Sequence, residues 1–291
     1  MNIDNKYAEY VSYFEQTLRG SLNGLDKNAP NVIKEAMKYA VSDGGKRVRP
    51  VLCYAASEML GLNKEAVKEL ALAVEFIHSY SLVHDDLPAM DNDDYRRGKF
   101  STHKKFGEAF GILAGDALLN YAYEICLRSD NFDAAHARAL YAIAECAGYS
   151  GMIAGQVLDL DCEKLETADE KTLYSIYENK TSKLLTAPLL AASELCGGAY
   201  RDELEEYGIN LGITFQITDD FMDADGDFAH IGKTPKKDEK ENKLTSIKVF
   251  GRDGARGLAK THYELAKKAI NAVPNSEFLS AFLDKLYKRT F

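Results

Sequence analysis

Apolar residues recur at spacings of three and four along almost the whole chain, the period of a helix buried on one face. Alternating runs of β-branched residues, which are typical of strands, are nearly absent. The pattern therefore predicts an all-α bundle, with helices near residues 5–20, 30–43, 50–61, 64–87, 106–129, 134–160, 169–195, 201–225, 255–271 and 275–288. The segment 224–246 breaks the pattern with Gly, Pro and dense mixed charge, so we expect a loop there, either a lid or a solvated loop with no role.

The composition fits a single folded domain over residues 1–291, because 46% of the residues are hydrophobic and nothing marks a linker. A net charge of −9 argues against a nucleic-acid partner, whose binding surface would be basic. No apolar run reaches the roughly 18 residues of a membrane span. Five scattered cysteines without a Cys-x-x-Cys pair indicate reduced thiols, and the expected compartment is the cytoplasm.

Two aspartate-rich segments end long helical stretches far apart in the chain: Asp85-Asp86-Leu87-Pro88-Ala89-Met90-Asp91 and Asp219-Asp220-Phe221-Met222-Asp223. Acidic residues at a helix C-terminus are unfavourable with the helix dipole, so simple helix capping explains them poorly. Mg²⁺ prefers oxygen ligands and commonly binds through one or two carboxylates together with substrate phosphates. Two such clusters predict one phosphorylated ligand held from both sides.

Three predicted helices each carry a line of small or polar residues at spacings of three and four, which places each line on one helix face. Burying such a line is costly unless its members are paired or bound to a metal, so we expect all three lines to face a shared interior. The lines are His78, Ser81 and Asp85; Gly212, Gln216, Asp219 and Asp223; and Gly148, Met152, Gly155 and Asp159, with Gln156 beside them.

Basic residues that suit phosphate groups lie near these lines. In residues 44–50 (GGKRVRP), the proline suits the first turn of a helix, so Lys46 and Arg49 would flank a helix N-terminus that attracts anions. Arg96 and Arg97 follow the first acidic cluster. Each group could instead be a solvated loop or a surface salt-bridge network, and Lys180 could reach a phosphate or simply extend to solvent.

Six motifs in this order resemble the trans short-chain polyprenyl diphosphate synthases, most closely the bacterial farnesyl diphosphate synthases. They are GGKRVRP at 44–50, SYSLVHDDLPAMDNDDYRRG at 79–98, AGDALL at 114–119, GMIAGQVLDL at 151–160, KTSKLL at 180–185, and FQITDDFMDADGD at 215–227 with GK at 232–233.

The resemblance implies a dimeric helical bundle of the isoprenoid synthase type with a central cavity. It also implies that an allylic diphosphate, dimethylallyl or geranyl, is held by three Mg²⁺ ions and ionises. Isopentenyl diphosphate then attacks the resulting cation, and a proton is lost. Release of diphosphate requires stabilisation of charge on the leaving group, which clustered cations supply.

The resemblance also assigns roles by motif position. Metal binding falls to Asp85, Asp86, Asp91, Asp219 and Asp223. The allylic diphosphate is assigned to Arg96, Lys180 and Lys233, with Thr181 and Gln216 at the reacting end. The metal-free diphosphate of isopentenyl diphosphate is assigned to Lys46, Arg49, His78 and Arg97. Lys243 is the candidate for a lysine that this family brings onto the substrate on closure.

Tyr80, the fifth residue before Asp85, bears on product length. A ring there would lie about one and a half helical turns below the metals and would form the floor of the pocket. In the family, an aromatic residue at this position accompanies a fifteen-carbon product, so (2E,6E)-farnesyl diphosphate is the expected product. The alternatives are a geranylgeranyl or geranyl diphosphate synthase, a terpene cyclase, a non-catalytic subunit of a heteromeric synthase, or an ordinary core position for Tyr80.

Overall fold

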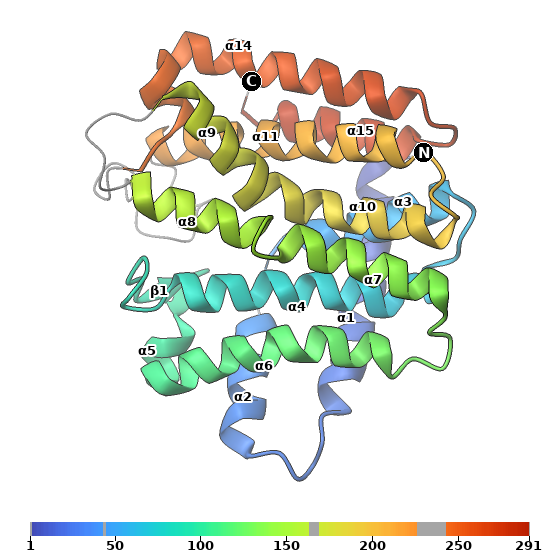
Figure 1. Cartoon of the computed structure of the whole chain (residues 1–291), viewed down its shortest axis with the longest axis vertical. Coiled ribbons are helices and arrows are strands. Elements are labelled where there is room, and N and C mark those ends of the chain that lie inside the picture. Colours follow the sequence, from blue (N-terminus) through green and yellow to red (C-terminus); the bar gives the residue numbers. More distant parts are fainter. Residues whose placement is uncertain (1, 43–44, 163–168, 226–242, 291) are drawn as a thin grey trace.

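The computed structural model describes residues 2–42, 45–162, 169–225 and 243–290, and this part of the chain is almost entirely helical (Figure 1). The elements are α1 Ile3–Asn23, α2 Asn31–Ser42, α3 Val48–Met59, the 3₁₀ turn η1 Lys64–Val67, α4 Lys68–Asp85, β1 Tyr95–Arg96, β2 Lys99–Phe100, α5 Thr102–Phe106, α6 Glu108–Leu127, α7 Ala134–Ala147, α8 Met152–Cys162, α9 Glu170–Ile176, the π-helix η2 Tyr177–Ser182, α10 Lys183–Leu195, α11 Arg201–Asp225, α14 Ser246–Asn271 and α15 Glu277–Tyr287. The predicted all-α class is confirmed.

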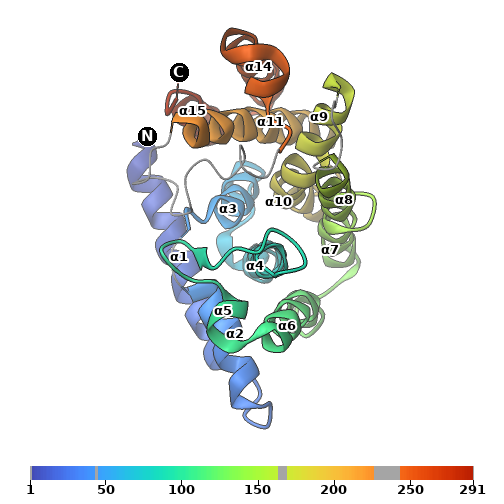
Figure 2. The same ribbon diagram turned by 90° about the vertical axis from the view of Figure 1, so that its left-hand side faces the viewer.

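Helix α4 lies in the middle of the bundle, with α3, α6 and α10 packed around it (Figure 2). Every residue from Leu70 to Ile77 is buried, whichever way it points. A helix that is apolar on all sides belongs in the interior rather than at the surface. Glu75 interrupts this apolar segment, although only 2% of its surface is exposed, so the central helix carries one deeply buried carboxylate.

The stretch predicted as one helix over 134–160 is two helices, α7 and α8, separated by residues 148–151. Gly148 caps the end of α7 in an extended conformation. A Cβ at Gly151 would lie 2.2 Å from the carbonyl oxygen of Cys146, so the chain reverses too tightly there for a side chain. The expectation that Gly148 shares a helix face with Met152 and Gly155 was therefore wrong.

The stretch predicted as one helix over 169–195 is also interrupted, by the six-residue π-helix η2. A π-helix has one more residue per hydrogen-bonded turn than an α-helix and is often found at functional sites. The hydroxyl of Ser182 donates a hydrogen bond to the carbonyl of Tyr177 over 3.0 Å inside this turn. Lys180 and Thr181 both lie within η2.

Smaller differences occur where glycine or polar residues end a helix. Gly107, with φ of 94°, separates α5 from α6. A short antiparallel hairpin pairs Tyr95 with Phe100, although no strand was predicted there. Helix α14 starts at Ser246, before the predicted start at 255, and has a non-helical residue at Gly251. Lys233 and most of the expected loop at 224–246 lie outside the described residues.

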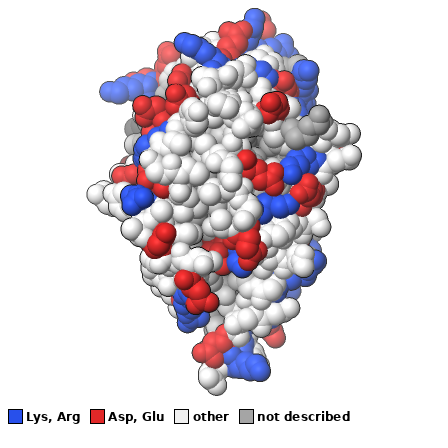
Figure 3. All heavy atoms as spheres, turned by 90° about the vertical axis from the view of Figure 1, so that its right-hand side faces the viewer, with Lys and Arg blue, Asp and Glu red and all other residues white. Residues whose placement is uncertain are grey.

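None of the helices in the described ranges is long and apolar enough to cross a membrane. On the face shown in Figure 3, acidic and basic side chains lie close to one another around a largely uncharged centre. Mixed charge of this kind is the ordinary pattern of a protein surface.

Two glycines bring helices close to η2. A Cβ at Gly155 on α8 would lie 2.1 Å from the backbone nitrogen of Lys180, and one at Gly212 on α11 would lie 2.4 Å from Cα of Ser182. Both neighbours are backbone atoms, which cannot swing away as a side chain does. The glycines in the predicted polar lines therefore serve close packing, and they hold η2 between α8 and α11.

We expect Gly155→Ala to destabilise the protein by about 1–3 kcal/mol, because the added methyl group overpacks against a fixed backbone. The measurement is urea-induced unfolding. Gly257→Ala is the matched control, since Gly257 lies in helix α14 with open space around its Cα and alanine is the better helix former there. Equal stability of the Gly155→Ala variant and the parent protein would contradict the close packing.

Candidate active site

A single large cavity of about 1320 Å³ brings together most of the residues singled out from the sequence. Its wall is formed by α3, α4, α8, η2 and α11, with the segments just before α3 and α14. The predicted residues that line it are Lys46, Arg49, His78, Tyr80, Asp85, Asp91, Arg96, Arg97, Lys180, Thr181, Gln216, Asp219, Asp223 and Lys243.

The two acidic segments both contribute to this cavity. Asp85 is the last residue of α4, and Asp91 lies in the turn that follows. Asp219 and Asp223 are one helical turn apart on α11 and face the same space. The helix-face spacing therefore identified correctly which aspartates of α11 share a face.

A different element of the chain supplies a polar partner to each of three cavity aspartates. The amide of Gln156 on α8 donates to Asp85 over 2.6 Å. Lys243, just before α14, donates to Asp91 over 3.0 Å, and Arg289 near the C-terminus donates to Asp219 over 2.8 Å. Repulsion between the collected carboxylates is offset in this way.

Asp86 differs from its neighbour Asp85. It is 2% exposed, is not part of the cavity wall, and accepts hydrogen bonds from Nε of Arg96 at 3.0 and 3.1 Å. Burial disfavours the charge on Arg96, but Asp86 outweighs it and raises the pKa of Arg96 above its ordinary value. The prediction that Asp86 binds metal does not match this position, which is that of a buried anchor for the segment after α4.

Asp220 in the second acidic segment is also buried and bound by the protein, but unlike Asp86 it contributes to the cavity wall. It is 3% exposed and accepts hydrogen bonds from the hydroxyl of Tyr177 and from the backbone and side chain of Ser246, the last two over 2.8 and 2.7 Å. Burial raises the pKa of Asp220 to about 7, although these hydrogen bonds lower it in part. Asp220 therefore ties η2 and the start of α14 to α11.

The acidic groups that line the cavity can bind a hard divalent cation only if other ligands complete its coordination. Among the residues described, no three His, Cys, Asp or Glu side chains lie close enough to hold a metal ion by themselves. Mg²⁺ commonly binds through one or two carboxylates together with waters and substrate phosphates. Asp85 with Asp91 on one side, and Asp219 with Asp223 on the other, fit that mode of binding.

A basic region adjoins the acidic one. Arg49 is half-buried, its buried Nε has no hydrogen-bond partner among the described residues, and burial lowers the pKa of Arg49 to about 10, with Arg97 lowering it further. Burial and the neighbouring Arg49 and Arg97 hold the pKa of His78 well below its usual range. Burial also lowers the pKa of Lys46. A buried guanidinium nitrogen without a partner, on a side chain that lines a cavity, favours an anionic ligand.

Two lysines face the acidic side. Burial lowers the pKa of Lys180, but Asp85 and Asp159 outweigh it and raise the pKa above its ordinary value. Burial also lowers the pKa of Lys243, but Asp91 and Asp159 outweigh it and raise that pKa above its ordinary value. Both lysines therefore stay charged at neutral pH. Beside them, the hydroxyl of Thr181 donates to the side-chain oxygen of Gln216 over 2.8 Å.

Apolar and aromatic side chains also line the cavity. Tyr80 is 6% exposed, and its ring lies edge-on to that of His84, with centroids 5.7 Å apart. Leu119, Leu185 and Phe215 line the cavity as well. The cavity therefore combines charged walls with an apolar pocket, as expected for a ligand that has a phosphate head and a hydrocarbon tail.

Sequence reasoning missed two basic residues of the site. Arg289 lies two positions before the end of the chain, where helical spacing gives no indication of which residue it contacts. Arg47 lies between Lys46 and Arg49, but its side chain is 2% exposed and bound to acidic residues. A left-handed backbone conformation at Arg47, with φ of 50°, places its side chain apart from those of its neighbours.

An all-α fold whose cavity joins two acidic clusters to a basic region defines an enzyme class that acts on phosphorylated, hydrocarbon-containing substrates. The model of the polyprenyl synthetase family matches residues 30–275, and the chain belongs to this family. It is a short-chain prenyltransferase.

Individual relatives agree with this assignment but differ in their products. The chain is 40% identical over 279 residues to the farnesyl diphosphate synthase of Haemophilus influenzae, covering 94% of this chain and 93% of that protein. It is 39% identical over 266 residues to the geranylgeranyl diphosphate synthase of Cyanophora paradoxa, with coverage of 90% and 89%. A geranyltransferase from Helicobacter pylori, solved with magnesium and isoprenyl diphosphate, superposes with a TM-score of 0.84 at 28% identity, with coverage of 99% and 97%.

We expect Asp85→Asn and Asp86→Asn to have different effects. Asp85→Asn removes a charge from the cavity wall and should lower prenyl transfer by roughly 100-fold or more with little change in stability. Asp86→Asn breaks the buried pair with Arg96 and should lower the free energy of unfolding by about 3 kcal/mol.

Thermal unfolding and Mg²⁺-dependent turnover, measured on both variants, separate these effects. Equal loss of stability in the two variants would contradict the distinction between cavity ligand and buried anchor.

Proposed function

We propose that the chain is a farnesyl diphosphate synthase, which condenses isopentenyl diphosphate with dimethylallyl or geranyl diphosphate to give (2E,6E)-farnesyl diphosphate. The observation that carries this proposal is the single cavity in which two acidic clusters, a separate basic region and an apolar floor meet. Each of these three parts corresponds to one requirement of the reaction.

The acidic clusters and two of the lysines serve the allylic substrate. Asp85, Asp91, Asp219 and Asp223 would hold three Mg²⁺ ions, which neutralise the diphosphate leaving group when bound. Lys180 lies beside Asp85 and stays charged, so it is suited to bind the same diphosphate. Arg96 lines the same wall, and Lys233 is assigned to this diphosphate by its motif alone. Heterolysis of the carbon–oxygen bond leaves its electron pair on the diphosphate.

The basic region serves the second substrate. Lys46, Arg49 and Arg97 would bind the metal-free diphosphate of isopentenyl diphosphate, and neutral His78 can offer a ring N–H hydrogen bond. The double bond of this substrate attacks the allylic cation and forms the new carbon–carbon bond. A proton then leaves the adjacent carbon, and the departing diphosphate accepts it.

Thr181 and Gln216 line the space between the two substrate sites, where positive charge would form. Because the Thr181 hydroxyl proton is directed at Gln216, the lone pairs of its oxygen remain available to face a cation. Lys243 donates a hydrogen bond to Asp91, so its positive charge lies beside the first acidic cluster.

The apolar floor is the basis for a fifteen-carbon product. Tyr80 on α4 lies below Asp85 on the helix that carries both residues, and its ring lines the cavity. A chain that grows from the metal site reaches this ring and stops. A geranylgeranyl product is the second candidate, because synthases of that name are also about 40% identical to the chain.

Two rival functions fit the site less well. A terpene cyclase would carry an Asn/Ser/Glu metal motif where α11 has Asp219 and Asp223, and it would have no use for a second diphosphate site. A non-catalytic subunit of a heteromeric synthase would be expected to lack one acidic cluster, whereas both line the cavity here.

A homodimer is part of this proposal. Helices α6, α7 and α8 lie at the front of the bundle in Figure 1 and along its right-hand side in Figure 2. Large apolar side chains are exposed on them, among them Ile112, Leu113, Tyr141, Ile153 and Val157. An apolar surface of this kind fits a protein partner, and a cytoplasmic homodimer is the form we propose.

The proposed reaction is tested by incubating the purified protein with isopentenyl and dimethylallyl diphosphates, with Mg²⁺ or with excess chelator. We expect mainly farnesol after dephosphorylation, and no product with chelator present. A twenty-carbon alcohol would favour geranylgeranyl diphosphate synthase, while no product from folded protein would contradict the proposal.

We expect Tyr80→Ala to lengthen the main product to twenty carbons or more, because removal of the ring opens the floor of the cavity. Tyr80→Phe is the matched control: it keeps the ring and should keep the fifteen-carbon product. The measurement is the product distribution by chain length. A Tyr80→Ala variant that still stops at fifteen carbons would show that Tyr80 is only a core residue.

A further inference from the structure

The basic segment before α3 contains a residue with an uncommon backbone conformation, Arg47. Arg47 adopts a left-handed conformation, with φ of 50° and ψ of 37°, immediately before the first residue of α3. A non-glycine residue in this region is uncommon and is favoured only when its surroundings hold it there. Lys46 and Arg49, on either side, line the cavity, and the buried Arg47 and Glu75 contribute to its wall beside them.

The guanidinium of Arg47 is committed to protein acceptors. Its Nε donates to Glu15 over 2.7 Å, its Nη1 to Glu75 over 2.8 Å, and its Nη2 to the carbonyl of Val41 over 2.7 Å. All three nitrogens are therefore engaged, with only 2% of the residue exposed. Arg47 itself is poorly placed to bind a substrate, although it belongs to the same motif as two residues that are well placed.

Glu75 links this arrangement to the rest of the basic region. It lies three residues before His78 on the central helix α4, so the two side chains share a helix face. Its buried negative charge raises the pKa of Arg47 and opposes the lowering of the pKa values of Arg49 and Arg97 by burial. One carboxylate therefore helps to keep three neighbouring arginines charged.

Helix α1 holds the same segment from the other side. Glu15 on α1 is the second acidic partner of Arg47, and the hydroxyl of Tyr7 on α1 donates to the backbone carbonyl of Lys46. The segment is thus fixed by side chains from α1 and from α4, two helices that it lies between. A shift of either contact would move the backbone that carries Lys46 and Arg49.

We propose that Arg47 and Glu75, with Glu15 as a weaker third member, form a positioning group that orients Lys46 and Arg49 toward the metal-free diphosphate of isopentenyl diphosphate. This inference rests on the proposed function of the cavity and adds three residues that bind no substrate themselves. Its consequence is selective: loss of the group should weaken binding of isopentenyl diphosphate and leave the allylic side of the cavity largely unaffected.

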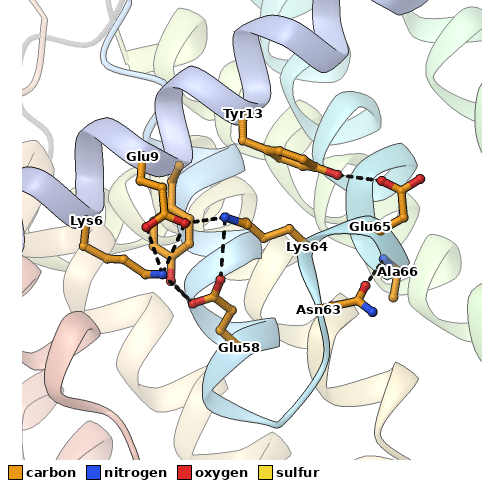
Figure 4. A network of polar contacts seen from close by, with 9 residues as sticks. Lys6, Glu9, Tyr13, Glu58, Asn63, Lys64, Glu65 and Ala66 are labelled. Carbon is orange, nitrogen blue, oxygen red and sulfur yellow. Dashed lines mark hydrogen bonds and ion pairs between the residues drawn. The ribbon is translucent and has the colours of Figure 1, made fainter.

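A second polar network also attaches α1 to the bundle, and it provides a control for effects that come only from loosening α1. Lys6 and Glu9 on α1 meet Glu58 on α3 and Lys64 on η1, with 2.9 Å between Lys6 and Glu58 (Figure 4). Tyr10 on α1 also donates to Glu58 over 2.9 Å. None of these residues lines the cavity. Glu58→Gln therefore weakens the attachment of α1 without touching the segment from Lys46 to Arg49.

The test compares Glu75→Gln, Arg47→Lys and Glu15→Gln with Glu58→Gln in the full-length enzyme with Mg²⁺. For Glu75→Gln and Arg47→Lys we expect the KM for isopentenyl diphosphate to rise about tenfold, the loss of roughly one charge-assisted contact. The KM for the allylic diphosphate and kcat at saturation should change less than about threefold. Arg47→Lys keeps the charge but not the three directed N–H groups, so retained charge alone should not restore binding. Glu58→Gln should leave both KM values unchanged.

Two results would overturn the positioning group: an unchanged KM for isopentenyl diphosphate in folded variants, or equal changes in both KM values and in kcat. Removal of one partner of a buried ion pair is strongly destabilising, so thermal unfolding is measured for each variant. If Glu75→Gln does not fold, the test rests on Arg47→Lys and Glu15→Gln. Glu15 is partly exposed, so its substitution is less destabilising.

A binding measurement separates failure of this inference from failure of the proposed reaction. Inorganic pyrophosphate is titrated calorimetrically into the enzyme in the presence of chelator. Binding by the parent protein that weakens about tenfold in Arg47→Lys supports the positioning group even if no prenyl transfer is observed. Equal binding in both proteins, or no binding by the parent protein, overturns it.

Discussion

Repulsion between like charges inside one cavity determines where this fold must place its charged side chains. Six aspartates line one cavity, and a group of cationic side chains lines the same cavity. In a partly buried site such charges interact more strongly than in water. Partners for them come from distant parts of the chain, including Gln156, Lys243 and Arg289. The fold can therefore be understood as a way to bring these counter-groups to one place.

The two acidic segments solve this problem in the same way. In each pair of adjacent aspartates the first, Asp85 or Asp219, lines the cavity, and the second, Asp86 or Asp220, is buried and bound by the protein, although Asp220 also contributes to the cavity wall. Asp86 secures the chain that follows α4, and Asp220 secures the chain that enters α14. One carboxylate of each pair remains for a ligand because its neighbour fixes the local backbone.

Much of the fold and part of the site could be predicted from local spacing alone. Spacings of three and four correctly placed His78, Ser81 and Asp85 on one cavity-facing line, since all three belong to the uninterrupted helix α4. The same reasoning failed for Gly148, because the helix ends there. It also could not distinguish Asp86 from Asp85, since α4 ends at Asp85 and helical periodicity has no meaning beyond it.

Other features depend on contacts that no local pattern contains. The inward direction of Arg47 follows from a left-handed backbone residue and from acceptors on α1 and α4. The contact of Arg289 with Asp219 joins residues 70 positions apart in the chain. The π-helix η2 has no distinct apolar pattern, and it is held by the close approach of two glycines on neighbouring helices.

The π-helix also constrains how the length of this chain can change. It contains one residue more than an α-helical turn needs, so deletion of any single residue from Tyr177 to Ser182 would leave a continuous α-helix. Because the π-helix takes up its extra residue locally, the α-helical parts before and after it would keep nearly the same orientation relative to each other. Leu184 and Leu185 in α10 would therefore stay in the core, whereas Lys180 and Thr181, which lie within the π-helix, would no longer both face the cavity. In this region a homologous sequence shorter by one residue would preserve the architecture and lose the site.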